Sequence, residues 1–143
     1  MSGSENESPS VKRIALKEYA AGAFLANAPI WILSAVLPPK WSGESIIKVA
    51  LTTYIITMAG GAWAGYLIAR KTGQSYIKAG LPTGLFSYSL YALFMTLTGV
   101  KGGFIEDVPP IFGFFIGGAV GARFWERQNQ QIRIRMKKDH AKE

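Results

Sequence analysis

The sequence predicts an all-α integral membrane protein with four transmembrane helices, arranged as two parallel-repeat hairpins, and a cytoplasmic helical extension of the fourth span. Hydrophobic residues make up 49% of the 143 residues and gather in four long runs, and a spanning helix needs roughly 20 mostly apolar residues. Glycines recur at four-residue intervals within the runs. Lysine and arginine are concentrated in alternate connecting segments. The length corresponds to a single domain.

Residues 1–18 form a polar N-terminal tail that ends in a short basic lead-in. The tail is rich in Ser, Glu, Asn and Pro and has no apolar periodicity, so we expect it to be disordered. The first span covers residues 19–37, with Pro29 inside it, where the missing N–H predicts a kink. A cleavable signal peptide ending at Ala26-Asn27-Ala28 is the competing interpretation. The apolar run continues to Leu37, which favours a span over a signal peptide.

Three further runs complete the four-span domain, which covers residues 19–125. The second span covers residues 46–69 and the third covers residues 79–100. The fourth covers residues 109–125 and opens with two prolines, which suit the first turn of a helix because the N–H groups there lack partners. No helix-breaking residue follows, so we expect the basic segment 126–143 to continue as a helix before it becomes a tail.

The distribution of basic residues predicts which side of the membrane each segment faces. The N-terminal segment, the middle loop and the C-terminal segment together hold 13 lysines and arginines, whereas the other two loops hold 3. Cytoplasmic segments carry the excess of positive charge. We therefore expect a multi-pass protein of the cytoplasmic (cell) membrane with both termini in the cytoplasm.

Glycine strips predict how the helices pack. Glycines spaced by four residues share one helix face, and a face without side chains lets another helix backbone approach closely, which is how helices associate in lipid. The fourth run has such a strip and the second has a shorter one. The expected packing residues are Gly60, Gly61, Gly65, Gly113, Gly117, Gly118 and Gly121.

The two halves of the chain resemble each other at an offset of 57 or 58 residues. Gly60-Gly61-Ala62 is echoed by Gly117-Gly118-Ala119, and the start of the first span is echoed by the start of the third. Each half enters and leaves on the same side, so the repeats are parallel and their symmetry axis lies along the membrane normal. We expect Gly61 and Gly65 to face Gly117 and Gly121 across the centre.

No catalytic, cofactor-binding or metal-binding residues are predicted. The chain has no cysteine, and its one histidine, His140, lies in the polar tail. No carboxylate pair or histidine cluster suits a metal, and no glycine-rich stretch is followed by the Lys-Ser or Lys-Thr of a phosphate loop. No ionisable residue lies in the middle of a span, which argues against a proton-coupled transporter. We expect a protein that is not an enzyme and has no cofactor.

Four of the polar residues within the predicted spans are candidates for a polar site. Asn27 is in the first, and Ser87, Tyr88 and Tyr91 form a patch in the third. Interhelical hydrogen bonds that fix helix register are the first interpretation of this group. A polar path or ligand site is the alternative.

The basic end of the chain predicts a docking segment for lipid headgroups or an acidic partner. Nucleic acid is not expected, because no aromatic residue follows Trp125 in this segment. The docking residues are Arg123, Arg127, Arg133, Arg135, Lys137 and Lys138.

Two glycine-rich segments, Gly60-Gly61-Ala62 and Gly117-Gly118-Ala119, are each followed by basic residues that end a span. In this layout the chain resembles a loose class of small, glycine-rich, four-span proteins of unknown function. Many of these are archaeal and are built as tandem hairpins. Small helical proteins of this kind also occur as accessory subunits of membrane enzymes, such as the archaeal ammonia monooxygenase. By this analogy the resemblance implies an accessory role.

The function that the sequence favours is a non-catalytic accessory or scaffold subunit of a multi-subunit membrane complex, with lipids and other membrane subunits as partners. The alternative is a small dimeric channel or facilitator for a neutral solute, built on Asn27 and the polar patch of the third span. A third hypothesis is a lipid-associated membrane organiser that works through the basic tail.

Overall fold

The computed structural model describes residues 16–36, 45–99 and 104–140 and is entirely helical over these ranges, with no strand. Four helices are present in the described part: α1 (Leu16–Val36), α2 (Ile46–Thr72), α3 (Tyr76–Leu97) and α4 (Phe104–His140). The predicted N-terminal tail lies outside these ranges, apart from its last three residues. The all-helical prediction is confirmed.

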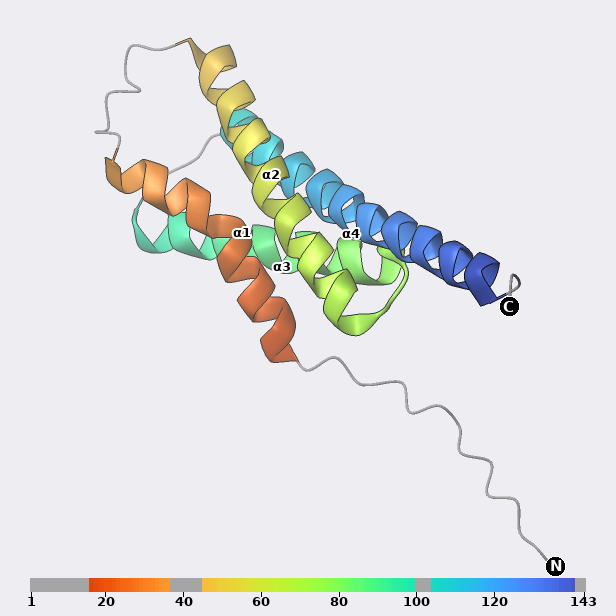
Figure 1. The fold of residues 1–143 in the computed structure, drawn as a ribbon. Coiled ribbons are helices and arrows are strands. Elements are labelled where there is room, and N and C mark those ends of the chain that lie inside the picture. The colour runs from red at the N-terminus through yellow and green to blue at the C-terminus, as the bar shows by residue number, and fades with distance from the viewer. Residues whose placement is uncertain (1–15, 37–44, 100–103, 141–143) are drawn as a thin grey trace, which may run out of the picture.

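The four helices pack side by side, and α4 is the longest (Figure 1). The most extensive contact joins α2 to α4; α3 also packs on α4, and α1 packs on both α2 and α3. The C-terminal turns of α4 project past the other three helices (Figure 1). The helix is continuous from Phe104 to His140, as expected for an extension of the fourth span.

The helix ends follow from local sequence signals. The helix α2 stops at Gly73, whose left-handed backbone (φ 67°) lets its N–H donate to the carbonyl of Ala69 at 2.8 Å. Glycine adopts this conformation without steric penalty. Only three residues then separate α2 from α3, so the two helices form a tight antiparallel turn.

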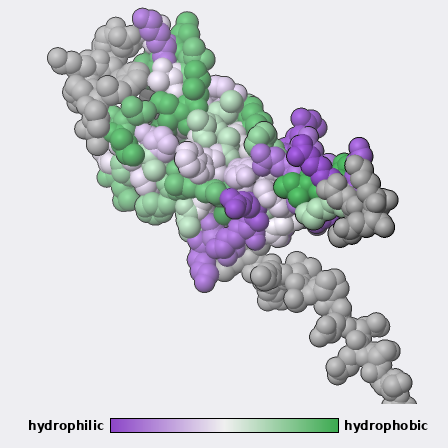
Figure 2. Space-filling model, in the orientation of Figure 1, coloured by the Kyte–Doolittle hydropathy of each residue, from purple (hydrophilic) through white to green (hydrophobic). Residues whose placement is uncertain are grey.

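The interior of the bundle is built from small and polar residues. Ala23, Ala26, Ala64 and Ala122 are at most 2% exposed, and Phe114 is the largest fully buried side chain. Large apolar side chains instead cover the outside (Figure 2). They occur on all four helices and include Phe24, Ile32, Leu51, Ile55, Trp63, Leu81, Leu85, Leu93, Phe112, Val120 and Phe124.

Two of the described helices are long and apolar enough to cross a membrane. They are Ile46–Thr72 and the Asp107–Lys138 part of α4. Neither α1 nor α3 meets the same criterion of length and hydropathy within the described residues. Membrane character is thus supported for α2 and α4 by this measure.

Candidate functional site: the helix seams and the basic end of the bundle

The contact between α2 and α4 is made largely by backbone. A side chain at Gly61 would meet the carbonyl oxygen of Phe114 and the amide of Gly118, and a side chain at Gly65 would meet the carbonyl of Gly118. Gly117 and Gly121 lie beside the carbonyls of Met58 and Ala62. The predicted helix pair therefore meets, but Gly61 and Gly65 face Gly118 and Phe114 rather than Gly117 and Gly121.

Gly118 also closes the contact between α4 and α3. A side chain on Gly80 would meet Gly118 and Ala119, and one on Gly84 would meet the backbone of Phe114 and Phe115. The backbone of α4 is therefore wedged between α2 and α3. This close packing requires glycine at these positions, because a methyl group there would strike backbone atoms that cannot move aside.

The two remaining predicted packing glycines make separate contacts. Gly113 lies against the hydroxyl of Thr57 and the carbonyl of Tyr54, which joins the start of α4 to α2. Gly60 lies against the carbonyl of Ala26, which joins α2 to α1. Each of the seven glycines that we singled out therefore sits at a helix–helix contact.

Asn27 joins α1 to α3. Its side-chain Nδ2 donates to the carbonyl oxygens of Ala23 and Ser87, each at 2.9 Å, and the residue is fully buried. The Ser87 hydroxyl donates to the carbonyl of Thr83 at 2.7 Å. The Oδ1 of Asn27 has no hydrogen-bond partner. Asn27 and Ser87 are thus enclosed between helices, as expected for an interhelical hydrogen bond.

Tyr88 and Tyr91 belong to a cluster of aromatic rings. Their rings stack with centroids 6.4 Å apart, and the ring of Tyr91 lies 6.1 Å from that of Phe114 on α4. Tyr91 is buried, and Tyr88 packs against the same cluster. The contact helps to hold α3 against α4, because tilted and offset aromatic pairs are favourable.

Polar contacts gather at the end of the bundle where α2 turns into α3. Lys71 forms a salt bridge with Glu18 at 3.0 Å, which ties the end of α2 to the start of α1. The Arg123 guanidinium lies 5.6 Å from the ring centroid of Tyr76, a cation–π contact between α4 and α3. We call this end, where Glu18, Lys71, Tyr76 and Arg123 meet, the basic end.

Two tyrosines complete the basic end. The Tyr19 hydroxyl on α1 donates to the carbonyl of Lys78 on α3 at 3.3 Å. The Tyr66 hydroxyl on α2 donates to Oε1 of Gln128 on α4, also at 3.3 Å. The starts of α1 and α3, the end of α2 and the α4 segment 123–128 therefore lie together, which is the arrangement that two parallel hairpins require.

The predicted docking residues divide into two groups. Arg123 and Arg127 lie at the basic end, and both are exposed. The others, Arg133, Arg135, Lys137 and Lys138, are exposed on the part of α4 that projects beyond it. The six docking residues therefore lie at one end of the bundle and along the part of α4 that projects from that end.

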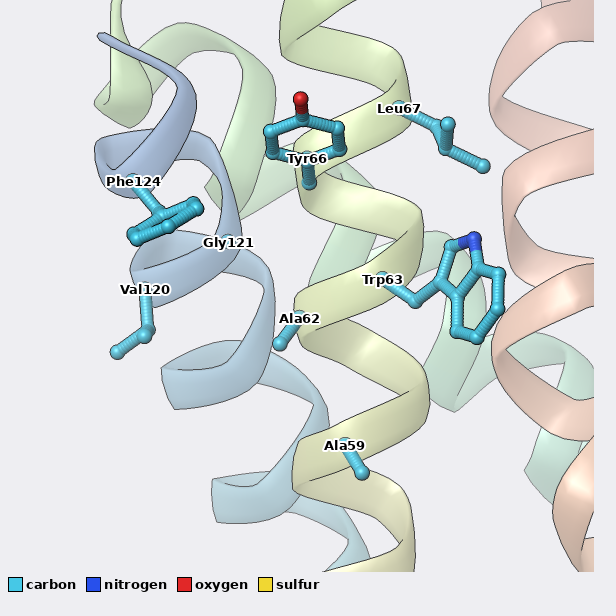
Figure 3. Close-up of a pocket in the computed structure, with 8 residues that line it drawn as sticks. All are labelled: Ala59, Ala62, Trp63, Tyr66, Leu67, Val120, Gly121 and Phe124. Atoms are coloured by element: carbon cyan, nitrogen blue, oxygen red, sulfur yellow. The ribbon is translucent and has the colours of Figure 1, made fainter. Parts of the chain in front are cut away.

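An apolar groove of about 580 Å³ runs between α2 and α4 on the outer surface. Among its lining residues are three aromatic ones: Phe124 on α4, Tyr66 on α2, and Trp63, which projects from the side of α2 that is turned away from α4 (Figure 3). The remaining lining residues are Ala59, Ala62, Leu67, Val120 and Gly121. The rings of Tyr66 and Phe124 lie 6.2 Å apart across it.

Sequence reasoning did not single out this groove. The signal was present as residues that repeat every three or four positions along α2, namely Ala59, Trp63 and Tyr66, opposite Val120 and Phe124 on α4. The pairing of the two helices was expected, but the gap that Ala59, Ala62 and Gly121 leave beside it depends on helix rotation. Helix rotation is not encoded in spacing alone.

Comparison with known proteins adds no relative: no family of known proteins, no curated protein and no solved structure matches this chain. Within the described ranges, no group of three or more His, Asp or Glu side chains is placed to hold a metal ion.

Proposed function

We propose that the chain is a four-span membrane protein that serves as a non-catalytic accessory or scaffold subunit of a larger membrane complex. The observation that carries this proposal is the inverted distribution of side chains. The described interior is made mostly of glycine, alanine, threonine, serine and asparagine, with Ile68, Tyr91 and Phe114 among its few large members, whereas most exposed large side chains are leucine, isoleucine, phenylalanine and tryptophan.

An outer surface of this kind suits lipid or other apolar helices. Monomeric soluble proteins rarely expose contiguous apolar patches larger than a few hundred Å². In lipid, helices associate through small residues and backbone approach instead of through burial of large apolar side chains. The exposed Leu81, Leu85 and Leu93 extend the pattern to α3, and Phe24 and Ile32 extend it to α1. This pattern supports a membrane location for all four helices.

The interior favours a structural role over a catalytic one. Backbone contacts at Gly61, Gly65 and Gly118 fill the space between α2 and α4. At depth, Nδ2 of Asn27 and the Ser87 hydroxyl donate hydrogen bonds between and within helices, whereas Oδ1 of Asn27 has no partner. The ionisable side chains of the described part lie at the ends of the helices or on the projecting part of α4.

Co-purification tests the accessory role. The tagged chain would be extracted in a mild detergent, separated on a native gel and analysed by mass spectrometry. We expect it to migrate in a larger assembly with membrane subunits in fixed stoichiometry. A lone monodisperse monomer or homodimer from the native membrane would contradict the proposal.

A matched pair of variants separates docking through α4 from non-specific association. The double variant Arg133→Ala/Arg135→Ala removes two positive charges from the exposed, projecting part of α4. The control, Ser89→Ala, removes an exposed hydroxyl on α3 that donates to the carbonyl of Leu85. We expect the first pair to weaken the assembly and the control to leave it unchanged. Equal effects would show that the projecting segment is not a docking element.

A further inference from the structure

The groove between α2 and α4 is lined mainly by apolar side chains, three of them aromatic. Trp63 is 65% exposed although it lies in the middle of α2, and Val120 and Phe124 are more than half exposed on α4. The volume of about 580 Å³ falls within the range of roughly 300–1,000 Å³ that is usual for ligand sites. The groove opens on the outer surface of the bundle, so an occupant would enter it from the surrounding phase.

Helix periodicity places two arginines one turn beyond the lining residues at one end of the groove. Arg70 follows Tyr66 by four residues and Leu67 by three, so it continues the groove-facing side of α2. Arg127 follows Phe124 by three residues and flanks the same opening on α4. Both side chains are exposed. Neighbouring Lys71 is instead engaged by Glu18 in a salt bridge.

The groove has the length of one bilayer leaflet. From Arg70 to Ala59 is eleven residues, which corresponds to about 16 Å along a helix. Half of the hydrocarbon core of a bilayer is about 15 Å. With Arg70 at headgroup level, the apolar part of the groove therefore reaches to the middle of the membrane.

We propose that this groove binds one anionic phospholipid, with an acyl chain along Ala59, Trp63 and Phe124 and the phosphate held by Arg70 and Arg127. The inference rests on the membrane location proposed above and assigns a ligand to one surface of the bundle. Basic pockets between spanning helices are suited to anionic headgroups. Tyr66, hydrogen-bonded to Gln128 at the same opening, fixes the two helices on either side of the headgroup.

A second copy of the chain fits this groove less well. Two copies inserted with the same orientation, related by an axis along the membrane normal, would bring Arg70 and Arg127 of each copy to the same level. Like charges that face each other across an interface are unfavourable. An anionic headgroup at that level neutralises them instead.

Native mass spectrometry of the full chain tests the proposal. The protein would be released from bilayers that contain equal amounts of phosphatidylglycerol and phosphatidylcholine with identical acyl chains. Each arginine near an anionic surface strengthens attraction roughly fivefold, so we expect phosphatidylglycerol to be retained about tenfold or more over phosphatidylcholine. The variant R70A/R127A should reduce this preference to about one.

Two matched variants locate the binding. K17A/K78A removes the same charge from exposed positions of α1 and α3 at the same end of the bundle, away from the groove, and should keep the preference. A59F places a ring on the exposed floor of the groove and should reduce retention of both lipids several-fold without a change in charge. Unchanged preference in R70A/R127A, equal loss in K17A/K78A, or full retention in A59F would each overturn the proposal.

Two further outcomes are distinguishable from these. Dimers without bound lipid would assign the groove to a second copy and overturn the lipid site while leaving the membrane proposal intact. Release of the chain from membranes by alkaline carbonate would overturn the membrane location itself, and the lipid site with it.

Discussion

At the scale of single residues, Gly65 and Gly22 show why the position of a glycine matters more than its presence. A methyl group at Gly65 would meet the carbonyl oxygen and Cα of Gly118, which belong to a helix backbone. A methyl group at Gly22 would meet only side-chain atoms, those of Ile68 at 3.1 Å, so a shift of a few tenths of an ångström in that side chain relieves the contact.

We therefore expect Gly65→Ala to lower the free energy of unfolding by about 1–3 kcal/mol, the usual cost of overpacking a tight contact. Gly22→Ala serves as the control and should cost well under 1 kcal/mol. Unfolding of the two variants in mixed micelles, followed by far-UV circular dichroism, measures the difference. Equal loss in both would show that the α2–α4 contact is not limiting for stability.

The polar residues show how far sequence reasoning reaches at this scale. Depth in an apolar run identified Asn27 as a group that requires a partner, because unpaired polar groups are costly in lipid. The sequence did not indicate that the partner is the backbone carbonyl of Ser87. Spacing defines the face of one helix, whereas a contact across sixty residues also depends on the vertical offset of the two helices.

At the scale of elements, the projecting part of α4 is separable from the bundle. Residues 130–138 are exposed on all sides, and the hydrogen bond from Tyr66 to Gln128 joins α4 to α2 just before them. A proline at position 131 would remove the hydrogen bond from its own amide and clash with the carbonyl of Arg127.

We expect Gln131→Pro to unfold the helix beyond that point and to leave the bundle intact. Hydrogen exchange should show rapid exchange of amides after residue 131 and unchanged protection in α2 and α3. Gln131→Ala, which favours the helix, is the control. Loss of protection throughout the bundle would mean that the extension contributes to the core.

Helix ends were predicted less well than helix positions. The span predicted over residues 46–69 ends three residues before α2 does, and the span predicted from residue 109 begins five residues after α4 does, whereas the continuation of the fourth helix past residue 125 was expected (α2, Ile46–Thr72; α4, Phe104–His140). Apolar length measures what crosses lipid, whereas a helix continues until a stop such as Gly73. Pro109 and Pro110 lie inside α4 instead of opening it, because a helix close to its start loses few hydrogen bonds to a proline.

At the scale of the whole molecule, the contacts at the basic end show which helix ends lie on the same side of the bundle. Lys71 pairs with Glu18, and Arg123 stacks on Tyr76, so α1 and α3 start where α2 ends and where the projecting part of α4 leaves the bundle. The opposite end carries the start of α2 and the end of α3. Excess positive charge at the basic end predicts that it faces the cytoplasm.

Single cysteines test this arrangement directly, because the chain contains no cysteine. Ser45 and Thr98 are exposed at one end of the bundle, and Ser75 and Gln131 are exposed at the other. In intact cells, a membrane-impermeant maleimide should label Ser45→Cys and Thr98→Cys. It should label Ser75→Cys and Gln131→Cys only after permeabilisation, since the reagent then reaches the cytoplasmic side.

Other arrangements of the helices predict different labelling patterns. If α2 and α4 cross the membrane and α3 does not, Ser75→Cys and Thr98→Cys will label from the same side. Ile55→Cys distinguishes a membrane protein from a water-soluble bundle, because Ile55 is 55% exposed in the isolated chain yet would lie in hydrocarbon, where a thiol does not ionise and maleimide does not react. Ready labelling at position 55 in native membranes would contradict a four-span arrangement, since it requires water along the outer face of α2.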